Sequence, residues 1–160
     1  MENLIKSTHK KWHEAKNYAA NRCRRTLPDV ARKLDLCEMF TGEETLPQLV
    51  ELIFSPQGRE FMLANQFPNI ATFRKFKPDE PEKLGVYIDA GAITINEPGK
   101  VFLIGKTTAE IYCRKTRANE IILMHGASAK VYASGYSVVH VESDRKSNAG
   151  VYVCDNAKIL

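Results

Sequence analysis

The segment 126–141, GASAKVYASGYSVVHV, most constrains the fold, because small and β-branched residues alternate along it. The alternation nearly repeats after eight residues, matching Val131 with Val139, Ala129 with Ser137 and Ala133 with Val141. Strict alternation places successive side chains on opposite faces of an extended strand. A near repeat with small residues at fixed places indicates stacked, closely spaced layers. The segment therefore predicts layered strands rather than an ordinary hairpin.

Similar short runs continue from Leu84 to the end of the chain, for example VYIDAGAITI, ILMHGASAKVY and VYVCDNAKIL. Seven of the nine glycines also lie beyond Leu84, as expected for tight corners and close approach between strands. We predict a short, irregular β-solenoid or β-roll over residues 84–160, with loops 114–119 and 143–148 projecting outward. An antiparallel sandwich is the alternative.

The first half has helical periodicity, and we expect a helical region over residues 1–80. An amphipathic helix is predicted from Glu2 to Arg25, followed by a second from Pro28 to Met39. Thr45 and Ser55 are expected to cap two further helices. A polar connector follows at residues 77–82. The predicted inward residues are Leu4, Ile5, Trp12, Ala15, Ala19, Cys23, Val30, Leu34, Cys37 or Met39, Phe61, Met62 and Ala64. The predicted fold class is α+β.

Two parts of the chain resemble known groups of proteins. The run 129–139 and the later DNAKI at 155–159 resemble the octapeptide β-repeats of uncharacterised phage and prophage proteins. The helical segments SPQGREF at 55–61 and Phe67-Pro68 are similar to small uncharacterised proteins of Bacteroides-type bacteria and their mobile elements. The resemblance implies an association with phage or mobile elements. It implies no activity and no catalytic residue.

Composition indicates a folded protein, since 44% of residues are hydrophobic and 26% are charged. No apolar run is typical of a secretory signal or a membrane span, so we expect a location in the host cytoplasm, or in the virion if a phage encodes the chain. The cysteines form no Cys-x-x-Cys pair and are expected to be free and mostly buried; they are Cys23, Cys37, Cys113 and Cys154.

No motif predicts catalysis, a metal or another cofactor. His9 and His13 lie four residues apart, but the glutamate of a metalloprotease helix is missing between them. Ser128 lacks the strand-turn-helix elbow of a nucleophile, although His125, His140 and the two late cysteines supply reactive groups. Aliphatic residues do not recur every six positions, which disfavours an acyltransferase of the left-handed helix type. We therefore expect a non-enzymatic protein.

Two groups of residues are candidates for binding. The first is a basic face of the N-terminal helix, where residues 1–40 carry nine Lys and Arg against five Asp and Glu: Lys6, Lys10, Lys11, Lys16, Arg22, Arg24 and Arg25. The second is a set of tyrosines in the β half: Tyr87, Tyr112, Tyr132, Tyr136 and Tyr152. The basic residues are suited to bind phosphate groups, and the alternative is that they form a solvated helix face. The outward tyrosines are suited to a protein interface, and the alternative is an aromatic ladder that only stabilises the sheet.

These features predict an interaction or structural protein that presents a rigid β surface to another protein or to copies of itself. A nucleic-acid-associated protein that uses the basic helix is the alternative, and an inhibitor of host defence is compatible with both. No membrane partner is expected.

Overall fold

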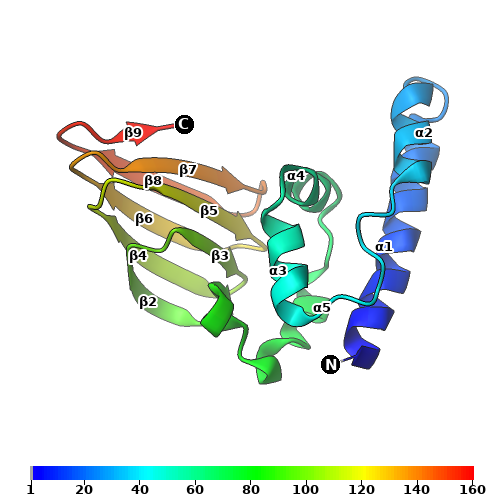
Figure 1. Cartoon of the computed structure of the whole chain (residues 1–160), viewed down its shortest axis with the longest axis horizontal. Helices are drawn as coiled ribbons and strands as arrows, with labels where there is room; N and C mark the ends of the chain where they lie inside the picture. Colours follow the sequence, from blue (N-terminus) through cyan, green and yellow to red (C-terminus); the bar gives the residue numbers. More distant parts are fainter. Residues whose placement is uncertain (1) are drawn as a thin grey trace. The chain divides into compact units, whose positions relative to one another are not determined.

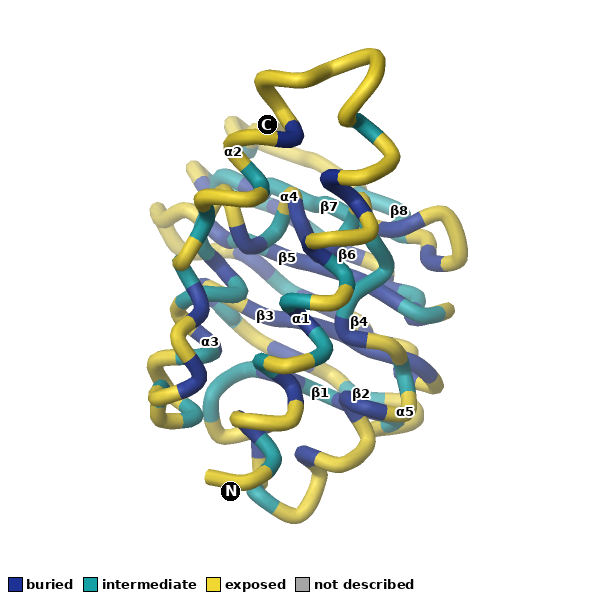
Figure 2. The backbone as a smooth tube through the Cα atoms, turned by 90° about the vertical axis from the view of Figure 1, so that its right-hand side faces the viewer, coloured by how far each residue is buried: buried dark blue, intermediate teal, exposed yellow. Residues whose placement is uncertain are grey.

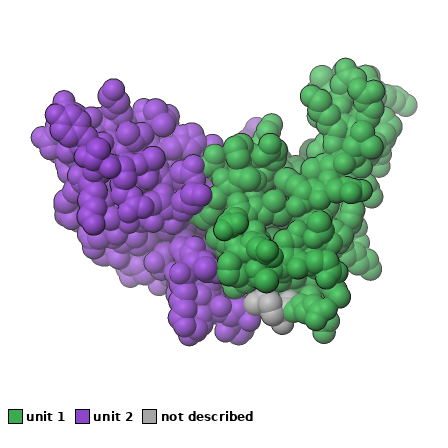
Figure 3. Space-filling view, viewed as in Figure 1, with its two compact units in different colours: residues 1–72 green, residues 73–160 purple. Residues whose placement is uncertain are grey.

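The structure, a computed structural model, describes residues 2–160. The chain forms two compact units, Met1–Thr72 and Phe73–Leu160, which are coloured separately in Figure 3. We call them the helical unit and the solenoid unit. Within residues 2–160, no helix has the length and apolar character required to cross a membrane.

The helical unit contains α1 (Glu2–Cys23), α2 (Pro28–Leu36), α3 (Leu46–Phe54), α4 (Pro56–Asn65) and the start of α5 (Ile70–Arg74) (Figure 1). Thr45 and Gln48 form a reciprocal capping box at the start of α3. Ser55 accepts a hydrogen bond from the Gly58 amide at the start of α4. Both predicted caps are therefore confirmed, because each satisfies amides that the first turn of a helix leaves free.

The core of the helical unit differs from the prediction at several positions. Ile5, Trp12 and Ala19 are buried as expected. However, Val30 is 42% exposed and the small residue Ala31 is buried in its place. Ala64, also predicted to point inward, is exposed. The helical period identifies an apolar stripe along one side of the helix. Which residues at the edge of that stripe are buried depends on the position of the neighbouring helix.

The solenoid unit begins with α5 residues and two short 3₁₀ helices, η1 (Lys77–Asp79) and η2 (Pro81–Leu84). Nine strands follow: β1 (Val86–Ile88), β2 (Gly91–Asn96), β3 (Lys100–Ile104), β4 (Thr107–Cys113), β5 (Ala118–Met124), β6 (Ser128–Ala133), β7 (Val138–Ser143), β8 (Asn148–Val153) and β9 (Lys158–Ile159). They alternate between two parallel sheets, in the orders β1-β3-β5-β7-β9 and β2-β4-β6-β8 (Figure 1). This unit is thus a two-sided β-solenoid of about four turns, which confirms the predicted α+β class with a solenoid in its second half.

The register corrects the predicted repeat length. From β3 onward, stacked residues lie 20 positions apart: Val131 pairs with Ile111 on one side and Val151 on the other. Val139, which matches Val131 in the sequence, pairs instead with Asn119 and Ile159 in the other sheet. The eight-residue match therefore does not mark stacked layers. The matched residues lie on two strands, one in each sheet, that face each other across the core.

The interior contains alternate residues of both sheets, including Leu103, Ile111, Leu123, Val131 and Val139. Strands β3 and β5 are mostly buried along their length (dark blue in Figure 2). Their outward residues are therefore buried as well; they are Phe102, Ile104, Ile122 and Met124. Phe73 covers part of this surface, since its ring packs edge-on against Phe102 at 5.6 Å between centroids. The runs VFLI and IILM have the continuous apolar character of strands that are buried on both faces.

Polar side chains hold the corners between coils. The Asn119 carboxamide oxygen accepts from the Gly99 amide at 3.2 Å, and Ser147 Oγ accepts from the Gly126 amide at 3.0 Å. Asp144 accepts from the His125 amide at 2.9 Å. Asn119, Asp144 and Ser147 are buried, so loops 114–119 and 143–148 are partly built into the solenoid rather than projecting throughout their length. Each bond satisfies an amide that the strand ladder leaves free at the corner.

Candidate interaction face

The outer face of the sheet β2-β4-β6-β8, which we call the ladder face, presents exposed polar and aromatic side chains. Parallel register places its outward side chains in three rows. One row contains Ala92, Thr108, Ser128 and Asn148; the next contains Thr94, Glu110, Lys130 and Gly150; the third contains Asn96, Tyr112, Tyr132 and Tyr152. All twelve are exposed or partly exposed.

Three tyrosines form a continuous ladder across this face. The rings of Tyr112 and Tyr132 stack with centroids 5.2 Å apart and an interplanar angle of 15°. Those of Tyr132 and Tyr152 stack at 5.2 Å and 17°. Strands in a sheet are about 4.8 Å apart, so identical rings at paired positions can stack. The ladder therefore follows directly from the parallel register.

The two ends of the ladder differ. At Tyr112, the Arg114 guanidinium lies 4.8 Å from the ring centroid, and Arg114 also donates to the Asn96 carboxamide oxygen at 3.5 Å. At the other end, Tyr152 is 55% exposed. Its ring lies beside Gly150, where an added Cβ would meet ring atoms at 3.5 Å. One end is thus covered by a cation, and the other presents an aromatic surface.

Charges of both signs lie next to the ladder. Glu110 accepts from the Tyr112 hydroxyl at 3.3 Å, and Lys130 is paired with Glu110 in the register. The Glu110 charge raises the pKa of Tyr112, with smaller contributions from desolvation and the hydrogen bond. Tyr112 therefore stays neutral over the physiological range. The face combines aromatic, hydroxyl, anionic and cationic groups on a rigid support.

The other two predicted tyrosines do not belong to this face. Tyr87 points into the solenoid and packs against the core, because its paired residue is Leu103. Tyr136 is 64% exposed, but it lies in the corner between β6 and β7. The five tyrosines therefore do not form one surface. The alternation correctly predicted that Tyr112, Tyr132 and Tyr152 point outward. Tyr87 lies at an inward position of its strand.

The predicted basic face is divided among several structural roles. Lys16 is buried, donates to the Cys37 carbonyl at 2.8 Å and lies 4.8 Å from the Trp12 ring centroid. Its predicted position on a solvent face is wrong, because its long aliphatic stem allows burial with the ammonium group still bonded. Lys11 is partly buried and donates to the Thr72 hydroxyl at 3.0 Å.

The remaining five basic residues are exposed. Lys6 pairs with Glu2 at 2.8 Å, and Arg24 pairs with Asp35 at 3.0 Å. The Arg22 guanidinium lies 5.1 Å from the Tyr18 ring centroid. Lys10 and Arg25 complete the predicted set. The seven cations therefore do not present one uniform basic surface.

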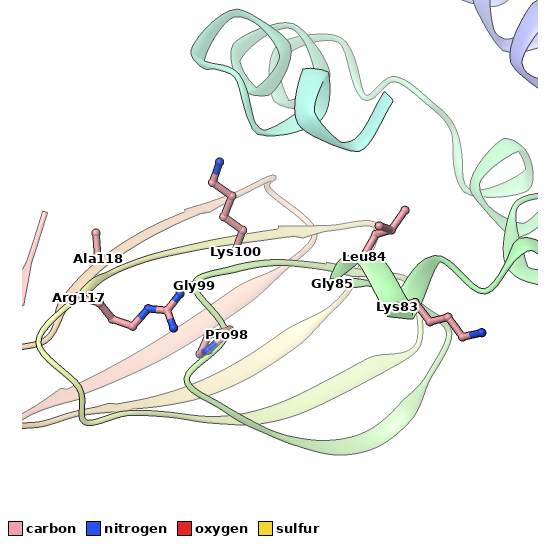
Figure 4. A pocket seen from close by; sticks show the side chains of 8 residues that line it. All are labelled: Lys83, Leu84, Gly85, Pro98, Gly99, Lys100, Arg117 and Ala118. Atoms are coloured by element: carbon pink, nitrogen blue, oxygen red, sulfur yellow. The ribbon is translucent and has the colours of Figure 1, made fainter. Parts of the chain in front are cut away.

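A hollow at one corner of the solenoid is a second place where basic groups gather (Figure 4). Its lining consists of Lys83, Leu84, Gly85, Pro98, Gly99, Lys100, Arg117 and Ala118. Arg117 extends along Gly99, whereas the ammonium groups of Lys83 and Lys100 point in other directions (Figure 4). Lys83 is also paired with Glu80. These cations do not converge on one ligand position.

The candidate reactive groups are dispersed. Cys113 is fully buried, and desolvation raises the pKa of its thiol to about 11, which leaves it protonated at neutral pH. Cys154 is exposed, and Cys23 and Cys37 are partly buried, so the prediction that most thiols are buried is wrong although all four are free. His140 bonds with Glu142 at 2.6 Å. Ser128 bonds with Thr108 on the ladder face.

His9 and His13 lie in an aromatic cluster of the helical unit. Their rings meet edge-on at 4.5 Å, and His9 also meets Phe40 edge-on at 5.1 Å. Desolvation lowers the pKa of His13, and the neighbouring His9 and Lys16 charges lower it further. Over residues 2–160, no three His, Cys, Asp or Glu side chains lie together as metal ligands.

Sequence reasoning missed Glu110, Lys130 and the order of the ladder. The signal was present, because Tyr112, Tyr132 and Tyr152 are spaced by 20 residues, the length of one coil. Glu110, Lys130 and Gly150 repeat with the same spacing. A search at the length of a full turn would have placed these rows together.

No protein-family model, curated protein or solved structure matches this chain.

Proposed function

We propose that the protein is a non-enzymatic interaction scaffold, and that the ladder face binds another protein. The observation that carries this proposal is the stacked row Tyr112, Tyr132 and Tyr152 beside Glu110 and Lys130. Tyrosine supplies a large contact area with few rotatable bonds, and its hydroxyl hydrogen-bonds at the rim. Charges of both signs next to the rings set the orientation of the bound partner and favour one partner over others.

Rigidity supports the same function. The side chains of the ladder face stand on strands that are bonded on either side in β4 and β6, above a core that includes Ile111 and Val131. The tyrosine rings are already stacked, so a partner need not order them on binding. Preorganised surfaces lose less side-chain entropy on association.

The proposed partner belongs to the host cell or to the phage or mobile element that we propose as the source of the gene. An inhibitor of host defence is one form of this function. Nucleic acid is the weaker candidate, because Lys16 is buried and Lys6 and Arg24 are paired with acidic residues. A uniform cationic surface is what phosphate binding requires.

Site-specific photo-cross-linking in the cells that naturally produce the protein tests the proposal. A photoreactive phenylalanine analogue replaces Glu110 on the ladder face in one variant, and Lys106, an exposed residue at a corner, in the matched control. We expect discrete covalent adducts with a second protein from position 110. The control position should yield none of these adducts.

The charge-reversed variant Lys130→Glu should lower the yield of the adduct formed from position 110 by about tenfold, the effect of losing about 1.4 kcal/mol at an interface. Lys106→Glu should leave the yield unchanged. Equal adducts from positions 110 and 106, or adducts with nucleic acid alone, would contradict a protein-binding ladder face.

A further inference from the structure

The tyrosine ladder brings phenol groups together as well as presenting them. The chain contains six tyrosines. Tyr112, Tyr132 and Tyr152 stack with 5.2 Å between the centroids of neighbouring rings. Within residues 2–160, ring contacts between tyrosines occur only in this ladder. The ladder therefore contains two close phenol pairs, and Tyr132 belongs to both of them.

The parallel register places equivalent atoms of the paired rings side by side. Tyr132 is the direct partner of Tyr112 on β4 and of Tyr152 on β8, so the three side chains leave neighbouring strands at equivalent points. Interplanar angles of 15° and 17° keep the rings nearly parallel. The ring torsion of tyrosine is broad, so a tilt of two neighbouring rings can bring one ortho carbon of each into contact. The pairs therefore have the geometry for a bond between rings.

We propose that the ladder is a site of oxidative modification, where a one-electron oxidant couples Tyr132 to Tyr152 or to Tyr112 as a dityrosine. The class of oxidant is a haem peroxidase that is driven by hydrogen peroxide. The new bond joins β6 to a neighbouring strand of the same sheet and so links two coils covalently. This inference goes beyond the proposed interaction function and does not rest on it.

The coupling is balanced in electrons and atoms. Each of the two tyrosines gives up one electron and its phenolic proton, which leaves a phenoxyl radical with spin on the ortho carbons. The two radicals form a carbon–carbon bond between these carbons. The ortho C–H bonds then break, and the two protons restore the two phenolic O–H groups. Hydrogen peroxide takes up the two electrons and the two protons that were first released, its O–O bond breaks, and two water molecules result.

The structure provides proton acceptors for this oxidation. The Glu110 carboxylate accepts a hydrogen bond from the Tyr112 hydroxyl at 3.3 Å, so it is placed to take the proton of that phenol. Tyr132 is partly exposed and Tyr152 is exposed, so water can accept their protons. Because the rings stack, a radical formed on one ring can exchange an electron with the next ring. The oxidant therefore needs access to only one tyrosine of the ladder.

Exposure alone predicts a different product. Tyr18 and Tyr136 are 66% and 64% exposed, against 55% for Tyr152. If access to the oxidant decided the reaction, Tyr18 and Tyr136 would couple, and their partners would come from other molecules. Groups that are held together react as if they were at a very high local concentration. In dilute protein, coupling within the ladder should therefore exceed coupling between molecules.

Peroxidase treatment of the full chain tests the inference. Dilute protein is first alkylated under native conditions to block the exposed Cys154, because a thiol would reduce the radicals. A haem peroxidase and hydrogen peroxide are then added, and the monomer is isolated and digested with trypsin. Cleavage after lysine and arginine places the ladder tyrosines in separate peptides, 107–114, 131–145 and 147–158. We expect peptide 131–145 to be joined to 147–158 or to 107–114 with the loss of two hydrogen atoms, and fragmentation should assign the bond to Tyr132.

Two phenylalanine variants separate proximity from exposure. Tyr132→Phe keeps a ring in the ladder but removes the phenol that both pairs share, and it should lower the yield of cross-linked monomer by about tenfold or more. Tyr136→Phe changes the same tryptic peptide at a more exposed position and should leave the yield unchanged. Cross-links that map to Tyr136, that persist in Tyr132→Phe, or that form only between molecules would each overturn the proposal. A wild-type monomer without any dityrosine would overturn it as well.

Stability gives a second readout that requires no variant. A bond from Tyr132 to Tyr152 or to Tyr112 joins residues 20 positions apart, so it restricts the unfolded chain, while the native chain already holds the rings together. The cross-linked monomer should therefore unfold at a higher denaturant concentration than alkylated monomer that was not oxidised. An unchanged or lower midpoint would show that the bond does not fit the native ladder and would refute the inference.

The outcome is separate from that for protein binding at the ladder face. The photo-cross-link from position 110 forms with a second protein in cells, whereas the dityrosine forms within one purified chain. Loss of the adduct with the dityrosine retained removes only the proposed interaction. Absence of the dityrosine with the adduct retained removes only the modification site.

Discussion

The corner residue Asn119 gives the sharpest test of how the coils are held together. It is 1% exposed, and its carboxamide accepts from the Gly99 amide and donates to the carbonyls of Arg117 and Val138, at 3.3 and 3.2 Å. The substitution Asn119→Asp keeps the shape and the acceptor but removes both donors. It also directs a carboxylate at two carbonyl oxygens.

The cost follows from these contacts. Each lost hydrogen bond is worth about 1 kcal/mol net. The ionised carboxylate is strongly disfavoured beside two carbonyls, so it is expected to take up a proton. Protonation at pH 7 costs about 4 kcal/mol, at about 1.36 kcal/mol for each pH unit above the ordinary aspartate pKa of about 3.9. A protonated carboxyl recovers one donor. The variant should therefore lose about 4–6 kcal/mol at pH 7 and about 1–2 kcal/mol at pH 4.

The stability deficit of the variant should increase with pH. Burial raises the pKa of the introduced carboxyl in the folded state above its unfolded value, so the folded state binds more protons. The deficit is then smallest below about pH 4 and grows as the pH rises. Asn148→Asp, at an exposed position on the ladder face, should change stability by less than about 0.5 kcal/mol at either pH.

Denaturant unfolding followed by far-UV circular dichroism measures the deficit, and hydrogen exchange at the Gly99 amide localises it. Trp12 fluorescence is unsuitable, because this residue belongs to the helical unit. A deficit below about 1 kcal/mol at pH 7, or one that does not shrink in acid, would refute the role assigned to Asn119.

Three further predictions follow from single side chains. Desolvation raises the pKa of Asp144, but the hydrogen bonds from the His125 amide, the Ser147 side chain and the Lys146 amide together outweigh it and lower the pKa. The stability difference between wild type and Asp144→Asn should therefore be present at neutral pH and shrink as the pH falls below about 4. An equal difference at pH 3 and pH 7 would contradict this. Tyr132→Ser removes both stacking contacts of the ladder and should lower the free energy of unfolding by about 1–3 kcal/mol in denaturant. Tyr136→Ser, at its exposed corner, should lower it by less than about 0.5 kcal/mol. Similar losses in the two variants would argue against the ladder. Under native conditions, a thiol reagent should modify Cys154 readily and Cys113 only after unfolding, because Cys113 is buried with a pKa of about 11; peptide mass mapping over time checks the order.

Much of the architecture could be predicted from local pattern. The change from helix to strand falls where periodicity changes, between η2 and β1, and the helix starts at Thr45 and Ser55 carry their own hydrogen-bonding groups. Outward placement of Tyr112 and Tyr132 follows from alternation alone. These features depend on interactions within a few residues.

The candidate site was only partly predictable. Alternation says that Tyr132 points outward, but it does not say which residue lies next to it on the neighbouring strand. The eight-residue match compared strands of opposite sheets, so the true neighbours, Tyr112 and Tyr152, were not recognised as stacked. Lys16 was placed on a solvent face for a similar reason, since its burial depends on the Cys37 carbonyl from another segment.

Local sequence pattern was sufficient to predict the alternation of apolar and polar positions, the helix caps and the glycine corners, because each arises from the geometry of adjacent residues. The 20-residue register, the tyrosine ladder and the burial of Phe102 and Met124 on an outer face became apparent only in the folded chain. Strand partners are chosen by side-chain packing and hydrogen bonding between residues far apart in the chain, and a one-sequence pattern contains no direct record of that pairing.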